Sequence, residues 1–144
     1  MRGKSDDRAH CLLAEAARRS IHQRRITGST PEHQRAVVHS LWIALTSGRV
    51  TEVIAVLSPT AEMITDNGGV VARTLRGATD VALRLCDLPP GEPTEIAEHE
   101  VNGRAGLVLR RHGFVVGVIC IDVTGDQVSD LWMVLNPTKL RHWN

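Results

Sequence analysis

The sequence is poor in the residues that most often carry chemistry. It contains no tyrosine, one phenylalanine and three tryptophans among 144 residues. Its three cysteines, Cys11, Cys86 and Cys120, lie far apart. Their number is odd and their spacing does not match a zinc cluster. We therefore expect free thiols in a reducing cytoplasm, with neither a metal nor another cofactor.

Long apolar runs are also missing. No stretch of about 18 consecutive apolar residues occurs, so no membrane span is expected. The first residues are polar and charged, and no apolar segment follows them, so a secretory signal peptide is not expected either. With 42% hydrophobic and 23% charged residues, the composition is typical of one soluble globular domain. The predicted location is the cytoplasm.

The net charge of +1 is unevenly distributed. Residues 1–25 carry seven Lys/Arg and three Asp/Glu, whereas the remainder carries ten and thirteen. Residues 9–25 lack Gly and Pro, which predicts a basic helix. Such a helix can face an acidic partner such as DNA, or it can be a solvated helix whose arginines lie along its apolar stripe. The side chains that would face DNA are Arg18, Arg19, Arg24 and Arg25.

Two helices joined as a hairpin are predicted next. Ser29 and Glu32 fit a capping box, and Pro31 is tolerated in the first turn of a helix. Apolar residues then recur at helical spacing until Gly48, where the first helix is expected to end. A second helix is predicted from Val50 until Ser58-Pro59.

Short strands and one further helix fill the rest of the chain. Loops as short as those in the last third can join only antiparallel neighbours. The predicted elements are strands at 61–66 and 70–75, a helix at 80–88, an edge strand at 94–100, and a meander at 101–110, 114–123 and 128–135. This order predicts an α+β fold in which a curved antiparallel sheet over three helices forms a cone with a mouth and an interior.

Aspartates near strand ends are the candidates for chemistry. Side chains alternate between the two faces of a strand. This alternation places Asp122 on one face of the predicted strand 114–123, and it places Asp130 and Trp132 together on one face of the predicted strand 128–135. If these are inner faces, a buried carboxylate there could act as acid or base. The alternative is that both aspartates are solvated turn residues. The predicted pocket residues are Trp132, Asp130, Asp122 and Trp42, and further candidates for chemistry are Asp66, His99 and His112.

No second member of a catalytic set is evident in the sequence. The chain has no tyrosine that could donate to an oxyanion. These observations favour a protein without enzymatic activity, while a small-molecule pocket of isomerase or hydrolase type stays open as the alternative.

An ordered set of short motifs resembles one known family. The motifs are Asp66-Asn67-Gly68-Gly69, Val101-Asn102-Gly103, Gly106-Leu107-Val108 with Arg110, Val115-Val116-Gly117-Val118, Asp122-Val123 and Asn136-Pro137-Thr138-Lys139-Leu140. Together they resemble the SnoaL-like domain at the C-terminus of extracytoplasmic-function sigma factors of the sigma-J-like group. The resemblance runs from about Glu32 to Leu140 and implies a domain at 29–144 with the cone-shaped fold of ketosteroid isomerase and SnoaL cyclases.

Residues 1–28 are similar to the end of sigma region four, whose recognition helix binds the promoter. That family usually has Arg-Gln after the cysteine, where Leu12 and Leu13 stand here. Polar side chains at those positions would face bases and phosphates. The first helices of region four are also absent, so a recognition helix has no partner helix to support it. DNA contact is therefore expected to be weak or lost.

The resemblance implies a regulatory domain that binds RNA polymerase or the sigma core regions rather than a catalyst. Its contact residues would be Asp66, Asn67, Gly68, Gly69, Asn102, Gly103, Asn136, Pro137 and Lys139. Val70 and Thr138 replace a lysine and an aspartate of the family. Each motif also has a purely local explanation, because Asn-Gly turns and a strand-ending proline are what hairpins need.

Two further expectations concern the whole chain. Both faces of 114–123 are apolar, and an apolar outer face needs cover, so a homodimer is predicted. The departures from the family motifs also allow a remnant that folds but has lost its role.

Overall fold

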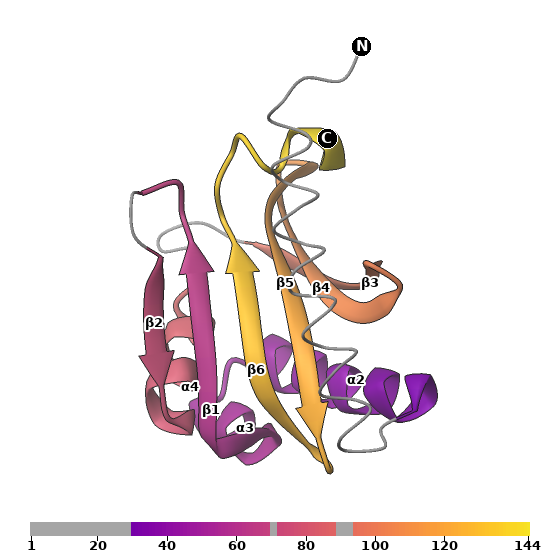
Figure 1. Ribbon diagram of the computed structural model, residues 1–144, viewed down its shortest axis with the longest axis vertical. Coiled ribbons are helices and arrows are strands. Elements are labelled where there is room, and N and C mark those ends of the chain that lie inside the picture. The colour runs from indigo at the N-terminus through magenta and orange to yellow at the C-terminus, as the bar shows by residue number, and fades with distance from the viewer. Residues whose placement is uncertain (1–29, 70–71, 89–93) are drawn as a thin grey trace.

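The computed structural model describes residues 30–69, 72–88 and 94–144. These residues form three helices, six strands and a short 3-10 helix (Figure 1). The predicted basic helix with its four arginines, the predicted cap Ser29 and the motif position Val70 lie outside the described residues. None of the three described helices has the length and hydrophobicity needed to cross a bilayer.

The helical hairpin forms where the sequence predicts it. Helix α2 spans Pro31–Ser47 and helix α3 spans Val50–Val56. The N-cap of α2 is Thr30 rather than the predicted Ser29, and the Thr30 hydroxyl accepts a 3.1 Å hydrogen bond from the backbone N–H of His33. Gly48 ends α2 with a φ of 74°, a conformation that glycine adopts without strain. The predicted end of α3 at Ser58-Pro59 is wrong, because the chain is already extended at Leu57.

Six strands make one sheet in the order β2-β1-β6-β5-β4-β3. The bounds are Leu57–Asp66 for β1, Arg73–Arg76 for β2, Glu95–Val101 for β3, Arg104–Arg111 for β4, Phe114–Thr124 for β5 and Gln127–Val134 for β6. The antiparallel meander β4-β5-β6 and the edge position of β3 are confirmed. The all-antiparallel prediction is wrong at the centre, where β1 and β6 pair in parallel.

Helices α2, α3 and α4 (Ala78–Cys86) cover one face of the sheet (Figure 1). Their apolar stripes pack against the strands to form the main core, in which Leu41, Val53, Met63 and Ile119 are fully buried or nearly so. The predicted α+β cone of a curved sheet over three helices is therefore confirmed. Side chains from all three helices and from β1, β4, β5 and β6 fill the space between the two layers.

A second apolar cluster lies apart from this main core and joins the sheet to the C-terminal segment. It comprises Val101, Val108, Val115, Val118, Val134 and Leu140, with Cys120, Trp132 and Trp143 packed against them. Leu140 leads into the 3-10 helix η1 (Arg141–Trp143), and the Asn144 amide bonds both backbone groups of Val115. The segment that follows Asn136 is thus part of the folded structure.

Irregularities in the sheet overturn the predicted inner face. The register shifts between Leu109 and Arg110 and again between Asp122 and Val123. Such a shift breaks the alternation of side chains, so Val116 and Val128 pack in the main core, whereas Val118 and Trp132 belong to the second cluster. The prediction that Trp132 approaches the interior of the cone is therefore wrong.

Candidate functional site

A buried polar network connects α2 with the β4-β5 pair. One guanidinium nitrogen of Arg104 donates to the Asp122 carboxylate at 3.1 Å, and another donates to the side-chain carbonyl of Gln34 at 2.7 Å. The Gln34 amide in turn donates to the backbone carbonyl of Ile121 at 2.8 Å and to that of Ala105 at 3.2 Å. Gln34, Asp122 and Arg104 are 2%, 6% and 8% exposed.

This network determines the chemistry available to Asp122. Its burial contradicts the alternative of a solvated turn residue. Its carboxylate is also bound to a guanidinium, so the negative charge is compensated within the protein. The arrangement holds three elements in register and gives Asp122 a structural role.

Cys120 lies next to this network and has an altered acidity. Burial and, to a smaller extent, the nearby Asp122 carboxylate raise the pKa of the Cys120 thiol to about 12, and the Arg104 guanidinium partly opposes this rise. A thiol with so high a pKa remains protonated near neutral pH and is a poor nucleophile. Cys86, at the end of α4, has a pKa raised by burial.

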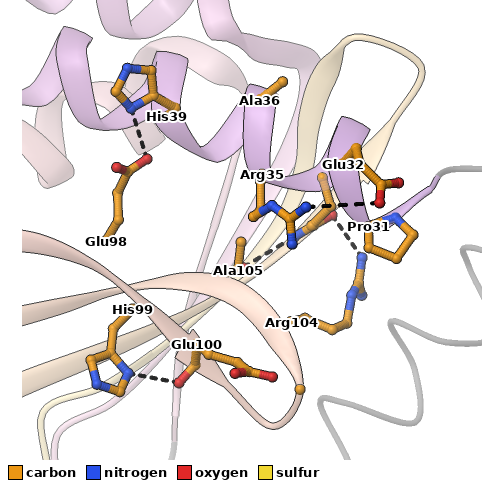
Figure 2. A pocket seen from close by; sticks show the side chains of 12 residues that line it. Pro31, Glu32, Arg35, Ala36, His39, Glu98, His99, Glu100, Arg104 and Ala105 are labelled. Atoms are coloured by element: carbon orange, nitrogen blue, oxygen red, sulfur yellow. Dashed lines mark hydrogen bonds and ion pairs between the residues drawn. The ribbon is translucent and has the colours of Figure 1, made fainter.

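A hollow of about 650 Å³ lies between the first half of α2 and the β3-β4 hairpin. Figure 2 shows its two walls, with His39 of α2 pointing toward Glu98 of β3. The His39 ring and the Glu98 carboxylate lie 3.0 Å apart, and Arg35 pairs with Glu32 at 3.8 Å. The hollow also reaches the buried Arg104.

The predicted pocket residues are absent from this hollow. Its lining includes neither Asp130 nor Trp132, and Trp42 lies behind His39, where the indole donates to the Ile96 carbonyl at 2.7 Å. Of the further candidates, His99 lines the hollow and its ring bonds the Glu100 carbonyl at 2.8 Å. Among the described residues, no three His, Cys, Asp or Glu side chains converge on a position for a metal ion.

Two motif segments that are far apart in sequence meet at the end of the β1-β6 pair. The Lys139 ammonium forms an ion pair with the Asp66 carboxylate, and these side chains are 17% and 13% exposed. The backbone N–H of Leu135 donates to the Asp66 carbonyl at 2.7 Å. Gly68 lies against the Asn136 side chain, where an added Cβ would be 3.4 Å from Oδ1. We call Asp66–Gly69 together with Asn136–Lys139 the motif cluster.

The loop ends of the motif cluster are shaped by local hydrogen bonds. Asp66 accepts from the backbone N–H of Gly68, and Asn136 accepts from that of Thr138, each at 3.1 Å. The first of these short turns leaves Asn67 and Gly68 exposed, and the second exposes Pro137 and Thr138. The sequence does not predict that Lys139 pairs with Asp66, because only the parallel β1-β6 pairing brings them together.

Asn102-Gly103 lies in a different place from the motif cluster. These residues have φ values of 52° and 78° and connect β3 to β4 as a two-residue hairpin turn. The predicted strand at 101–110 therefore begins only at Arg104. His112 and Gly113, with φ values of 53° and 83°, connect β4 to β5 in the same way.

Comparisons with known proteins support the fold. No protein-family model matches the chain, and no curated protein sequence matches it. The structure is similar to that of the Mycobacterium tuberculosis extracytoplasmic function sigma factor SigJ, with a TM-score of 0.54 and 22% identity over 76% of this chain. The matched region covers 44% of SigJ, so the chain spans less than half the length of that protein.

Two other structures have a comparable similarity. An NTF-2 like protein from Burkholderia xenovorans LB400 has a TM-score of 0.55 and 14% identity, over 73% of this chain and 84% of its own. An LEH-like epoxide hydrolase from M. tuberculosis has a TM-score of 0.50 and 16% identity, over 76% of this chain and 86% of its own. At identities this low, the similarity shows a shared architecture and not a shared function. The chain therefore has the NTF2-like fold, which is also the fold of a putative ketosteroid isomerase.

Proposed function

We propose that the chain is a SnoaL-like regulatory module of the sigma-factor type, acting through protein contacts in transcription initiation. The observation that supports this most directly is the meeting of two motif segments in the motif cluster, which places their exposed turns on one surface. The order of the motifs and the fold that the chain shares with SigJ support it as well.

Features of the interior also favour contact over catalysis. Apart from the hollow beside α2, the space between the helices and the sheet is filled by buried apolar side chains. The candidate acid Asp122 is bound to Arg104. A general acid or base must reach the proton that it transfers, so a buried carboxylate that is bound to a buried guanidinium is poorly suited to this task.

Binding to purified RNA polymerase holoenzyme from the native cell tests this proposal. We expect the immobilised chain to bind the holoenzyme, and Lys139→Ala to weaken binding because it removes the ion pair between the two motif segments. Arg73→Ala, on the exposed strand β2, is the matched control. An unrelated NTF2-like domain of similar size sets the background, and binding no stronger than that background would contradict the proposal.

The hollow between α2 and the β3-β4 hairpin favours a second candidate function, the binding of a small molecule. Its volume of about 650 Å³ is within the range of small-molecule sites. Native mass spectrometry of the chain purified from its own cells would reveal a bound compound. Ala36→Trp places a large side chain at the wall of the hollow and is expected to abolish the extra mass. A chain that carries no compound and takes up none from a cell extract would refute this candidate.

A further inference from the structure

Two glutamates of β3 face the hollow between α2 and the β3-β4 hairpin. Side chains alternate along a strand, so Ile96, Glu98 and Glu100 lie on one face of β3. Ile96 packs against the main core and Glu98 contacts His39 of α2, which identifies this face as the one toward the helix. Both glutamates line the hollow, and Figure 2 shows them on its hairpin side.

The charges around the hollow do not balance. Its lining includes three glutamates and two arginines. One of these arginines, Arg104, is already bound to the buried Asp122, so Arg35 is the arginine that remains to balance three carboxylates. Within the part of the chain that the structure describes, no side chain pairs with the Glu100 carboxylate. The hollow therefore carries an excess of negative charge.

The setting of Glu100 distinguishes it from other exposed glutamates. An exposed glutamate without an ion pair is common, and alone it identifies no site. Glu100, however, lies in a hollow of about 650 Å³, which has room for a small molecule. Its cross-strand partner Ala105, together with Ala36 and Pro31, gives the same hollow short apolar surfaces. None of the described residues that line it is Phe, Tyr or Trp, so a flat ring finds no aromatic face there.

These features indicate the class of ligand. An ammonium group donates up to three hydrogen bonds and accepts none, so carboxylates are its natural partners. An anion would instead be repelled by three carboxylates. A carboxylate accepts several hydrogen bonds, so Glu98 can bind an ammonium group while the His39 ring contacts its Oε1 atom.

The spacing of the two glutamates restricts the class further. Two residues along a strand separate the Cα atoms of Glu98 and Glu100 by about 6.7 Å, which matches two nitrogen atoms with three or four carbon atoms between them. The carbon chain of such a molecule is narrow and apolar, and it fits beside Ala36 and Ala105.

We infer that the hollow binds a linear aliphatic amine with at least two cationic nitrogen atoms, which Glu98 and Glu100 hold by charged hydrogen bonds. This inference rests on the second candidate function, since it names the class of ligand for the same hollow. It is independent of the proposed contacts with RNA polymerase.

Isothermal titration calorimetry of the full chain with spermidine tests this inference. We expect saturable binding to the wild type. Glu98→Gln/Glu100→Gln should raise the Kd by about tenfold or more, because it removes both charged acceptors. The matched control Glu52→Gln/Glu95→Gln makes the same charge change outside the lining of the hollow. It should change the Kd by less than about twofold, because salt screens distant surface charges. Circular dichroism verifies that every variant is folded.

Further probes examine the ligand class and the place of binding. Butylamine, which has one cationic nitrogen, should bind at least about tenfold more weakly than spermidine. Glutarate, a dianion of similar length, should not bind. Ala36→Trp should abolish spermidine binding, because it places a large side chain at the wall of the hollow. Tighter binding of glutarate than of spermidine would overturn the ligand class.

The remaining outcomes separate this inference from the small-molecule function itself. Absence of spermidine binding, or binding that is unchanged in Glu98→Gln/Glu100→Gln, would overturn the inference. If the chain purified from its own cells carries a compound that is not an amine and Ala36→Trp loses it, the hollow is a small-molecule site of another class. A chain that carries no compound, takes up none from a cell extract and does not bind spermidine would overturn both.

Discussion

At the scale of single residues, Arg104 joins the other two side chains of the buried polar network to each other. It bonds Asp122 on the neighbouring strand and Gln34 on the helix above it. All three side chains are buried, so removing any one of them would leave a buried polar group of its partner without a hydrogen bond. The network therefore fixes where α2 lies on the sheet, and it explains why polar residues are retained inside an otherwise apolar layer.

Removing the Arg104 guanidinium should be strongly destabilising. In Arg104→Met, the Asp122 carboxylate remains buried without its cation, and we expect the free energy of unfolding to fall by about 3–5 kcal/mol. Urea unfolding followed by circular dichroism measures the change. Arg73→Met on the exposed strand β2 is the control, with an expected effect within about 0.5 kcal/mol. Equal effects of the two substitutions would show that the network contributes nothing special to stability.

Cys120 should make the stability of the protein sensitive to alkaline pH. The folded thiol has a pKa of about 12, whereas an unfolded thiol has a pKa of about 8.5. As the pH rises between these values, the unfolded chain loses the proton first, so the free energy of unfolding falls. The contribution is fully present below about pH 8.5, and about 3 kcal/mol of it is lost by pH 10.5.

Urea unfolding of the wild type and of Cys120→Ala at about pH 7.5 and 10.5 checks this dependence. The wild type should lose more stability than the variant over this interval. Because the chain has no tyrosine, no phenol ionises in the same range. Parallel losses in the two proteins would argue against a raised pKa for the Cys120 thiol.

At the scale of elements, periodic patterns predicted most of what is local. The helical spacing from Val37 to Leu45 and the two short turns of the meander led to α2 and to β4-β5-β6. Strict alternation failed where the register shifts beside Arg110 and Val123, since a bulge moves every following side chain to the other face. A bulge has no reliable signature in a single sequence, so the face of Trp132 was predicted wrongly.

The ion pair between Asp66 and Lys139 should stabilise the end of the β1-β6 pair. A double-mutant cycle with Asp66→Asn and Lys139→Met measures its coupling energy, which we expect at about 1–3 kcal/mol because both side chains are largely shielded from water. The more exposed pair of Glu62 and Arg76 is the matched control, with an expected coupling below about 1 kcal/mol. A coupling for Asp66 and Lys139 no larger than that of the control would mean that the motif cluster is held by its backbone contacts alone.

At the scale of the whole molecule, the order of elements was sufficient to predict the cone but not what fills it. Three helices and a curved sheet have few ways to bury their apolar faces, so the architecture follows from the pattern. The hollow beside α2 combines residues such as Arg35 and Glu98, which are distant in sequence. The feature of the sequence that relates to this hollow is the acidic edge strand, which carries Glu95, Glu98 and Glu100. Sites assembled across such separations need the tertiary structure before they can be recognised.

Homodimer formation through the outer face of the sheet stays a prediction. Size-exclusion chromatography with light scattering should give twice the monomer mass at high protein concentration. Ile64→Arg places a charge beside Trp132, its partner in the parallel strand pair, and should shift the protein toward monomer. Monomeric wild-type protein at every concentration would exclude the dimer for the free chain.

The parallel pairing of β1 with β6 also has a consequence for the synthesis of the protein. Leu57 pairs with Val128 and Asp66 with Val134, so the centre of the sheet is closed by contacts between residues about 70 positions apart. A nascent chain on the ribosome presents the apolar strand β1 with one unpaired edge until β6 has been translated and has left the exit tunnel. Unpaired strand edges of this kind are prone to association between chains. The protein is therefore expected to fold only after synthesis of its last strand, and to depend on chaperones that bind nascent chains more than a helical bundle of the same length would.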